Sequence, residues 1–181
     1  EVSTMLPVLS MEFCRWRVCG LRVLLRAKRP LMIDGFRSYV PDGVHGQKLR
    51  IYYSVGCFPD ARDQMEEADW NLVHTSTLQP DRNSPLTKLC TGLGVWVEEG
   101  WHTFYLHYES TRPDDIRANR ELNPIAMGGP YVAASSYSYD VVASDEVLEV
   151  YRGCNTNSTI PFHNPSANCF AFIGAVLYKK C

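Results

Sequence analysis

The chain has 181 residues, of which 45% are hydrophobic and 21% are charged, and its formal net charge is −2. These values describe an ordinary globular chain that can bury a core, and they exclude a disordered or fibrous protein. The longest apolar run, at 21–25, is interrupted by Arg22, so the sequence predicts no membrane span.

The distribution of aromatic and β-branched residues indicates the fold class. Aromatic residues make up 12% of the chain, and short runs of them alternate with Gly, Pro, Asn and Asp. Such runs are typical of strands joined by turns. The sequence therefore predicts an all-β fold, a jelly-roll-like β-sandwich with one short surface helix and stabilising disulfides. We expect one domain over 1–181, with N-terminal strands in 1–58, the helix in 59–69 and the main sandwich in 70–181.

Seven cysteines are scattered along the chain without the spacing of a zinc or redox motif. So many cysteines in a chain of this length favour disulfides and an extracellular setting. We expect three bridges among the six residues Cys14, Cys19, Cys57, Cys90, Cys154 and Cys169. Cys181 is then the spare thiol and can link two chains; alternatively, it closes onto Cys14 or Cys57 and another thiol is buried.

A glycosylation triplet gives secretion a second, weaker support. Asn157, Ser158 and Thr159 form an acceptor for N-glycosylation, without the proline in the middle that would block it. The sequence therefore predicts a secreted glycoprotein.

Basic residues are concentrated near the N-terminus. The first 50 residues carry nine basic and four acidic side chains, whereas the remaining 131 carry nine and sixteen. The patch between Arg15 and Arg29 can be interpreted as a site for a polyanion such as a sulfated glycan or a nucleic acid. Arg15 and Arg22 alternate with apolar neighbours, however, which favours the solvated charged face of half-buried strands. We therefore predict no nucleic-acid partner.

The N-terminal part is expected to be extended over 6–18 and 21–27, with Gly20 at a turn or bulge between the two segments. The segments form either a hairpin, in which Cys14 comes near Cys19, or one bent strand. Turns are predicted at 33–35 and at 41–43, and a strand follows over 49–55.

Helix-forming residues at 59–69 predict a short surface helix with Asp60 as its cap. Its carboxylates can be interpreted as a calcium site. The alternating acids and the central glycine of the calcium-loop motif are absent, so we favour a solvated helix face and no metal. The carboxylates belong to Asp60, Asp63, Glu66, Glu67 and Asp69.

Further strands are predicted along the rest of the chain. Residues 70–77 form a strand before a surface loop at 79–85, and 94–97 and 101–108 form a β-hairpin around the turn at 98–100. After the exposed loop at 109–123 come strands over 131–142 and 146–151, and then a segment that a bridge between Cys154 and Cys169 would close. The last strand, 170–178, is apolar almost throughout and is expected at the centre of a sheet.

Two parts of the sequence carry a resemblance to a known superfamily. They are GVWVEEGWHTFY at 94–105, and DEVLEV at 145–150 with FAFIGAVLY at 170–178. They resemble the strand, glycine turn and aromatic strand, and then the acidic turn and terminal strand, of the tumour necrosis factor and complement globular-head superfamily. About half of the chain is covered, and 109–127 departs from the family by being short and charged.

The resemblance implies a ten-stranded or similar jelly roll, a trimer supported by aromatic inner strands, and outer loops that contact a receptor or another ligand. Closed β architectures of this kind fit the strand pattern. Protective-antigen-type sugar-binding domains share a similar glycine-then-aromatic hairpin and are the rival interpretation.

The chain was searched for catalytic motifs. It contains no Gly-x-Ser-x-Gly elbow, no phosphate-binding glycine loop and no His-Glu-x-x-His helix. His102 and His107 are five residues apart on a predicted strand, which places them on opposite faces, so one metal ion does not suit both. We therefore predict no enzymatic activity, no cofactor and no metal site.

Six residues are candidate ligand-binding residues. Tyr137 and Tyr139 lie on one face of a predicted strand and form either an aromatic wall for sugar rings or an apolar molecule, or an aromatic core or subunit interface. The charged loop supplies the other four, which are Arg112, Asp114, Asp115 and Arg117.

These observations predict a secreted, non-enzymatic, lectin-like binding protein, a homo-oligomer that recognises a cell-surface receptor or a glycan through its surface loops. The alternative is a structural or storage subunit of an extracellular assembly that carries an apolar ligand or pigment.

Overall fold

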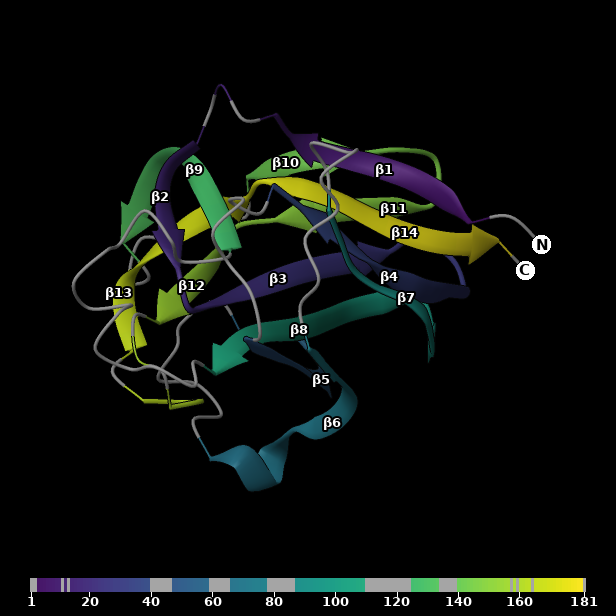
Figure 1. Ribbon diagram of the computed structural model, residues 1–181. Coiled ribbons are helices and arrows are strands. Elements are labelled where there is room, and N and C mark those ends of the chain that lie inside the picture. Colours follow the sequence, from purple (N-terminus) through teal and green to yellow (C-terminus); the bar gives the residue numbers. More distant parts are fainter. Residues whose placement is uncertain are drawn as a thin grey trace.

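The computed structural model describes residues 3–10, 12, 14–39, 47–58, 66–77, 87–109, 125–133, 140–156, 158, 160–163 and 165–180. Their regular structure is almost entirely β-strand, arranged in two antiparallel sheets that enclose a common core (Figure 1). This confirms the predicted all-β class and the sandwich arrangement. No helix in the described residues is long and apolar enough to cross a membrane.

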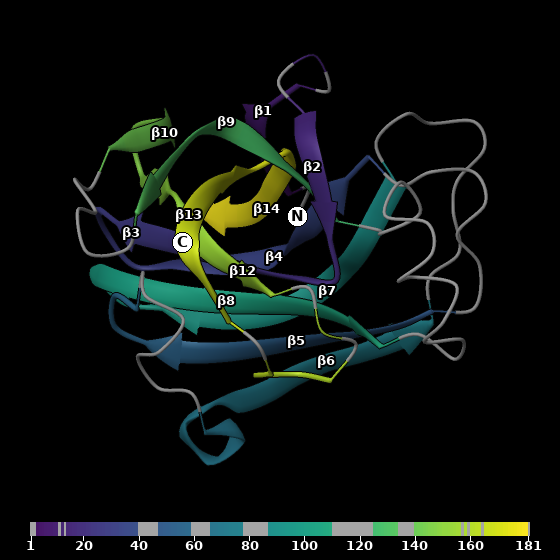
Figure 2. The same ribbon diagram turned by 90° about the vertical axis from the view of Figure 1, so that its left-hand side faces the viewer.

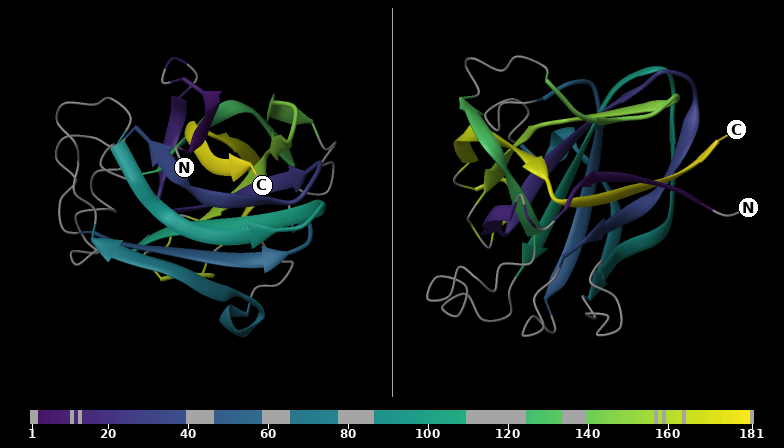
Figure 3. Two further views of the ribbon diagram at one scale, coloured as in Figure 1. Left: turned by 90° about the vertical axis from the view of Figure 1, so that its right-hand side faces the viewer. Right: turned by 90° about the horizontal axis from the view of Figure 1, so that it is seen from above.

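The smaller sheet has four strands. In spatial order they are β1 (Thr4–Leu9), β14 (Gly174–Lys180), β4 (Leu31–Ser38) and β7 (Thr87–Val97). The first and last strands of the chain are neighbours, since Thr4 is paired with Tyr178. As a result, both chain ends lie at the same end of the molecule (Figures 1 and 3).

The larger sheet has ten strands, eight of which form its main path. In spatial order these eight are β2 (Cys14–Val18), β9 (Ile125–Ala133), β13 (Pro165–Phe172), β12 (Gly153–Thr156), β3 (Gly20–Ala27), β8 (Gly100–Glu109), β5 (Lys48–Val55) and β6 (Asn71–Thr77). The strand β11 (Leu148–Tyr151) pairs with the C-terminal half of β3, residues 24–27, and β10 (Val141–Ser144) pairs with β11. Figure 2 shows β8, β5 and β6 following one another along one side of this sheet.

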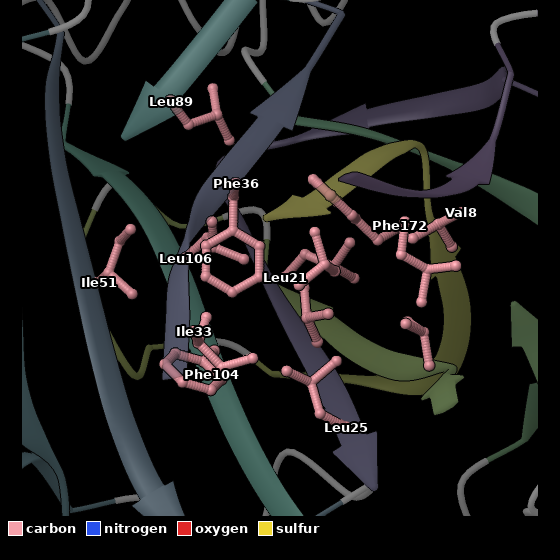
Figure 4. Packing of buried hydrophobic residues seen from close by; sticks show 14 of the residues in the cluster. Val8, Leu21, Leu25, Ile33, Phe36, Ile51, Leu89, Phe104, Leu106 and Phe172 are labelled. Atoms are coloured by element: carbon pink, nitrogen blue, oxygen red, sulfur yellow. The ribbon is translucent and has the colours of Figure 1, made fainter. Parts of the chain in front are cut away.

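The core lies between the two sheets and includes aromatic rings from both. Phe36 of the smaller sheet packs against Phe104 and Phe172 of the larger one, with ring centroids 5.4 and 6.3 Å apart (Figure 4). Leu21, Val23 and Leu25 of β3 point into the same core. The alternation of apolar residues along β3 therefore follows the two-residue period of a strand.

Several predicted strands are confirmed, and the predicted helix is reduced. Strands at 48–55 and 71–77 match the expected ones, whereas the described part of 59–69 contains only a short 3-10 turn at Glu67–Asp69. Residues 59–65, and the turn at 41–43, lie outside the described residues.

The expected turn at 33–35 is wrong, because these residues lie inside β4. Gly35 marks a close approach of two backbones instead of a turn. A Cβ atom at this position would lie 2.1 Å from the carbonyl oxygen of Cys90 in the neighbouring strand β7, next to an irregularity in the pairing register. Glycine inside a strand often marks a bulge or a site where another backbone approaches closely.

The alternative of a hairpin around Gly20 is also wrong. The strands β2 and β3 are separated by Cys19 alone, and they pair with β9 and β8 respectively, not with each other. Residues 14–27 therefore follow the bent-strand alternative. The chain reversal that would have brought Cys14 beside Cys19 does not occur.

The predicted hairpin at 94–108 is the main correction to the topology. Both of its strands exist, but β7 pairs with β4 in the smaller sheet and β8 pairs with β3 and β5 in the larger sheet. The short turn between them carries the chain from one sheet to the other. Val97 of β7 and Phe104 of β8 both point into the shared core, so alternating apolar positions predict the buried side chains without predicting the pairing partner.

The C-terminal apolar run also divides between the sheets. Its first part ends β13 in the larger sheet, and its second part is β14, which lies between β1 and β4 as the expected central strand. The chain crosses at Ile173 and Gly174. A Cβ atom at Gly174 would lie 2.0 Å from the carbonyl oxygen of Arg37, so only glycine fits at this crossing.

We expect the Gly174→Ala substitution to lower the free energy of unfolding by about 1–3 kcal/mol, because the added methyl group overlaps backbone that cannot move away cheaply. Urea unfolding monitored by tryptophan fluorescence measures this loss. Thr75→Ala, at an exposed position of the edge strand β6, is the control and should change stability by less than about 0.5 kcal/mol. Equal effects of the two substitutions would contradict the crossing geometry.

Candidate ligand-binding pocket

The outer face of the larger sheet, opposite the core, carries a second cluster of buried side chains. Arg22 of β3 is paired with Tyr105 of β8, while the next pair, Leu21 with Leu106, belongs to the core. Successive side chains of a strand point to opposite faces. Arg22 and Tyr105 therefore lie together on the face that points away from the smaller sheet.

Four aromatic rings pack on this outer face. Tyr105 stacks on Tyr52 of β5 with ring centroids 5.9 Å apart, and Trp70 lies 6.1 Å from Tyr105. Phe162, from the segment between β12 and β13, lies 4.9 Å from both tyrosine rings. Tyr52, Trp70 and Tyr105 are buried, so these rings form a small apolar cluster separate from the main core.

The guanidinium group of Arg22 is held within this aromatic cluster. Its side chain is only 4% exposed. Nη1 donates a hydrogen bond to the carbonyl oxygen of Phe58 over 3.1 Å, and the guanidinium carbon lies 5.2 Å from the centre of the Trp70 ring. Contact between an arginine and an aromatic face is favourable, and it keeps a permanent positive charge at a mostly apolar site.

A small pocket lies beside Arg22. Its cavity volume is about 10 Å³, which is room for about one water-sized group. Among the described residues that line it are one arginine and one histidine, and none of these described residues is a carboxylate. The lining residues are Arg22, Tyr105, Cys154, Asn155, Thr156, Phe162 and His163. The charge of the lining therefore favours an anionic ligand over a cationic one.

The strands β12 and β13 and the segment between them form one wall of the pocket. Thr156 donates its hydroxyl to the carbonyl oxygen of His163, and the backbone N–H of Phe162 donates to the hydroxyl of Tyr105 over 3.4 Å. Phe162 has a φ of 62°, in the left-handed region that is unfavourable for a residue with a bulky side chain. Ring packing against Tyr52 and Tyr105 compensates for this conformation.

His107 lies on the same face as Tyr105 and is fully buried. Its Nε2 is 2.9 Å from the carbonyl oxygen of Ser158, so this nitrogen carries the proton and donates it. Burial lowers the pKa of His107 to about 4, although the Ser158 bond opposes this shift. The ring is therefore neutral at physiological pH.

The expected placement of His102 on the opposite face is confirmed by the pairing of β8 with β3. His102 contacts Tyr53, with Nδ1 2.9 Å from the tyrosine hydroxyl. Within the described part of the chain, no group of three His, Cys, Asp or Glu side chains is close enough to hold a metal ion. Of the carboxylates considered for calcium, Glu66, Glu67 and Asp69 are exposed, and the other two lie outside the described residues.

Solvation of the basic patch was predicted incorrectly at one position. The expected alternation holds along β3, and Arg26 is exposed as predicted, but Arg22 is buried. Segments that are distant in sequence, around Phe58 and Phe162, cover this part of the face. Periodicity within β3 carries no information about these covering segments.

The predicted ligand-binding residues, the glycosylation site and the spare cysteine cannot be compared with this pocket. Arg112, Asp114, Asp115, Arg117, Tyr137, Tyr139, Asn157 and Cys181 all lie outside the described residues. Their roles therefore stay predictions. Sequence reasoning included Arg22 only as part of the basic patch, and it missed the pocket formed with Tyr105 and Phe162, which are far apart in the sequence and meet only through the fold.

Comparison with known proteins gives no relative for this chain: no family model matches it, and no curated protein matches it.

The neutral His107 gives a pH-dependent stability that can be measured. The unfolded chain binds a proton near the ordinary histidine pKa of about 6.5, whereas folded His107 does so only near pH 4. The unfolded state therefore binds more protons between these values, and stability falls as the pH falls. We expect His107→Gln to remove about 2 kcal/mol of the loss in unfolding free energy between about pH 7.5 and about pH 5.

Urea unfolding at the two pH values measures this difference, since other titrating groups contribute equally to the parent and the variant. His163→Gln is the matched control, because His163 is exposed. The same pH dependence in the parent and in His107→Gln would show that His107 is not held neutral by burial.

Proposed function

We propose that this protein is a secreted, non-enzymatic recognition domain that binds an acidic glycan in the Arg22 pocket. The single observation that carries the proposal is a buried arginine beside packed aromatic rings, in a pocket whose described lining residues include no carboxylate. In the wider proposal, a jelly roll that forms homo-oligomers follows from the resemblance to the tumour necrosis factor and complement globular-head superfamily, and the stabilising disulfides follow from the number of cysteines.

Chemical complementarity supports an acidic sugar as the ligand class. A guanidinium group can donate two parallel hydrogen bonds to a carboxylate, and such charge-assisted pairs are stronger than neutral ones. The apolar face of a sugar ring can pack against the partly buried ring of Phe162. The cavity of about 10 Å³ is close to the volume that one water molecule needs, so in this proposal only the carboxylate enters beside Arg22 and the sugar ring stays outside the pocket.

The state of the nearby titratable groups supports binding without catalysis. The neutral His107 already uses Nε2 in its bond to Ser158. Burial raises the pKa of Tyr105, so its hydroxyl stays protonated at physiological pH. A general base needs a pKa close to the working pH, and neither group meets this requirement.

The charged loop supplies a second set of proposed contacts. Arg112, Asp114, Asp115 and Arg117 are proposed to contact a cell-surface receptor or the neighbouring units of the glycan, with Tyr137 and Tyr139 as stacking residues. In this proposal the pocket holds the carboxylate of the terminal acidic unit, and the loops provide selectivity for the units attached to it. Loops commonly carry recognition residues on a rigid β-scaffold.

The alternative, a structural or storage subunit that carries an apolar ligand or pigment, is favoured by the aromatic share of the same lining. The two functions differ in what they require of Arg22. Binding of an apolar molecule does not depend on the guanidinium charge, whereas binding of an acidic sugar does.

We expect the protein to bind glucuronic acid, with glucose as the neutral comparison, and Arg22→Gln to weaken this binding by about 10- to 100-fold. Isothermal titration calorimetry measures the affinity, and quenching of tryptophan fluorescence, to which Trp70 and three other tryptophans contribute, gives a second measure of binding. Arg26→Gln is the matched control, because Arg26 lies on the same strand and face but is exposed. Circular dichroism and the melting temperature show whether Arg22→Gln is folded.

Two results would contradict the proposed function. One is equal affinity of the unsubstituted protein for glucose and glucuronic acid, which does not depend on any variant being folded. The other is unchanged binding of glucuronic acid in folded Arg22→Gln.

Size-exclusion chromatography with and without reductant tests the proposed oligomer. We expect an assembly larger than one chain, and partial dissociation on reduction if Cys181 links chains. An unchanged oligomer in Cys181→Ser would assign the assembly to non-covalent contacts, and a monomer under all conditions would refute it.

A further inference from the structure

We propose that Cys154 and Cys169 form a disulfide that fixes the β12–β13 wall of the pocket and so sets its affinity for ligand. The effect on binding rests on the proposed glycan binding, whereas the disulfide itself rests only on the proposed secretion.

The two sulfur atoms are already in contact. Cys154 of β12 is the direct cross-strand partner of Cys169 of β13, and their Sγ atoms are 2.7 Å apart. Carbon atoms that are not bonded prefer separations of about 3.5–4.0 Å, and sulfur is the larger atom, so this distance is inside ordinary non-bonded contact. Directly opposed residues of antiparallel strands are separated by about the distance that a disulfide spans.

The position of the pair connects it to the pocket. Cys154 lines the pocket together with Arg22, and it precedes Thr156, whose hydroxyl bonds to His163. The strand β12 has only four residues, and its pairing with β13 is irregular after Cys154. A covalent link at this point fixes the two ends of the segment that carries Phe162 and His163.

Formation of the bond requires an oxidant. The two thiols together lose two protons and two electrons as the sulfur–sulfur bond forms. A disulfide such as oxidised glutathione accepts the electrons and leaves as two thiols, through a mixed disulfide with one of the cysteines. Such oxidants are present in the secretory route that the proposed function requires.

The disulfide limits the number of conformations that the segment between Cys154 and Cys169 can adopt in place of the binding conformation. A bridge across about 15 residues removes conformational entropy from the open chain, and ligand binding then has less of the wall to order. Oxidised protein is therefore the high-affinity form. Reduction leaves Phe162 and His163 held only by ring packing and hydrogen bonds.

Peptide mapping of the secreted, unreduced protein tests the covalent part. After alkylation with iodoacetamide and proteolysis, we expect a peptide in which Cys154 is linked to Cys169, and its separation into two alkylated peptides after prior reduction. Alkylation of both cysteines in unreduced protein that has been incubated with oxidised glutathione would overturn the disulfide.

Stability provides a second readout with a matched control. We expect the double variant Cys154→Ala/Cys169→Ala to melt about 10 °C below the parent. Loss of a bridge that closes a loop of about 15 residues lowers the free energy of unfolding, and in a chain of this size each kcal/mol lost lowers the melting temperature by a few degrees. Ser38→Ala, which removes a buried hydroxyl group from the smaller sheet, should cost clearly less. Equal melting temperatures for the two variants would also overturn the disulfide.

The binding part is tested with glucuronic acid as the probe. We expect at least a fivefold loss of affinity in the double variant and no loss in Ser38→Ala. If Cys154 and Cys169 are linked in the parent, but the parent and the double variant bind the probe with equal affinity, the proposal that the disulfide sets the affinity of the pocket is overturned. Linked cysteines without binding of the probe in any form would instead refute the proposed function and leave the disulfide in place.

Discussion

The central pair of strands, β3 and β8, is covered on both faces, and the remaining structure depends on this constraint. One face of the pair forms the core with the smaller sheet, through Leu21, Val23 and Phe104. The other face is covered by segments that follow β5 and β12, and it buries Arg22 and Tyr105. Few sheets of a sandwich are covered on both sides, since an antiparallel sheet usually has one face in water.

Double coverage explains why a charged residue is buried in this protein. On a solvated face, Arg22 would behave like Arg26, whose guanidinium group makes a loose ion pair with Glu149 at 3.7 Å. Beneath the covering segments, the charge is satisfied by the carbonyl group of Phe58 and by the face of Trp70. Burial under the same segments lowers the pKa of His107 and keeps its ring neutral. The covering segments therefore account both for the buried charge of Arg22 and for the lowered pKa of His107.

Much of the fold could be predicted from the sequence, because strands leave a local pattern. The strands at 48–55 and 71–77, and the central position of the last strand, follow from alternation and apolar content alone. Pairing could not be predicted in the same way. The segment 94–108 has the turn and alternation of a hairpin, yet its two strands belong to different sheets, because a short turn can join strands within a sheet or across the core.

The pocket was beyond sequence reasoning for a related reason. Its residues come from β3, β8, β12 and the segment after β12, and nothing local in the sequence marks them as neighbours. The contact between Cys154 and Cys169 was the exception, since a loop bounded by two cysteines is visible in the sequence. The glycines were ambiguous: Gly35 and Gly174 serve close backbone approaches, and only the neighbouring strands reveal this.

The adjacency of the first and last strands has a geometric consequence. Because β1 and β14 are neighbours, both ends of the chain leave the domain together, at the end remote from β12 (Figures 1 and 3). Copies joined at this end would leave the opposite end of each domain, with β12 and the pocket, uncovered. If the proposed glycan binding and the proposed oligomer both hold, several such pockets would bind one glycan-bearing surface together, with a combined avidity far above that of a single domain.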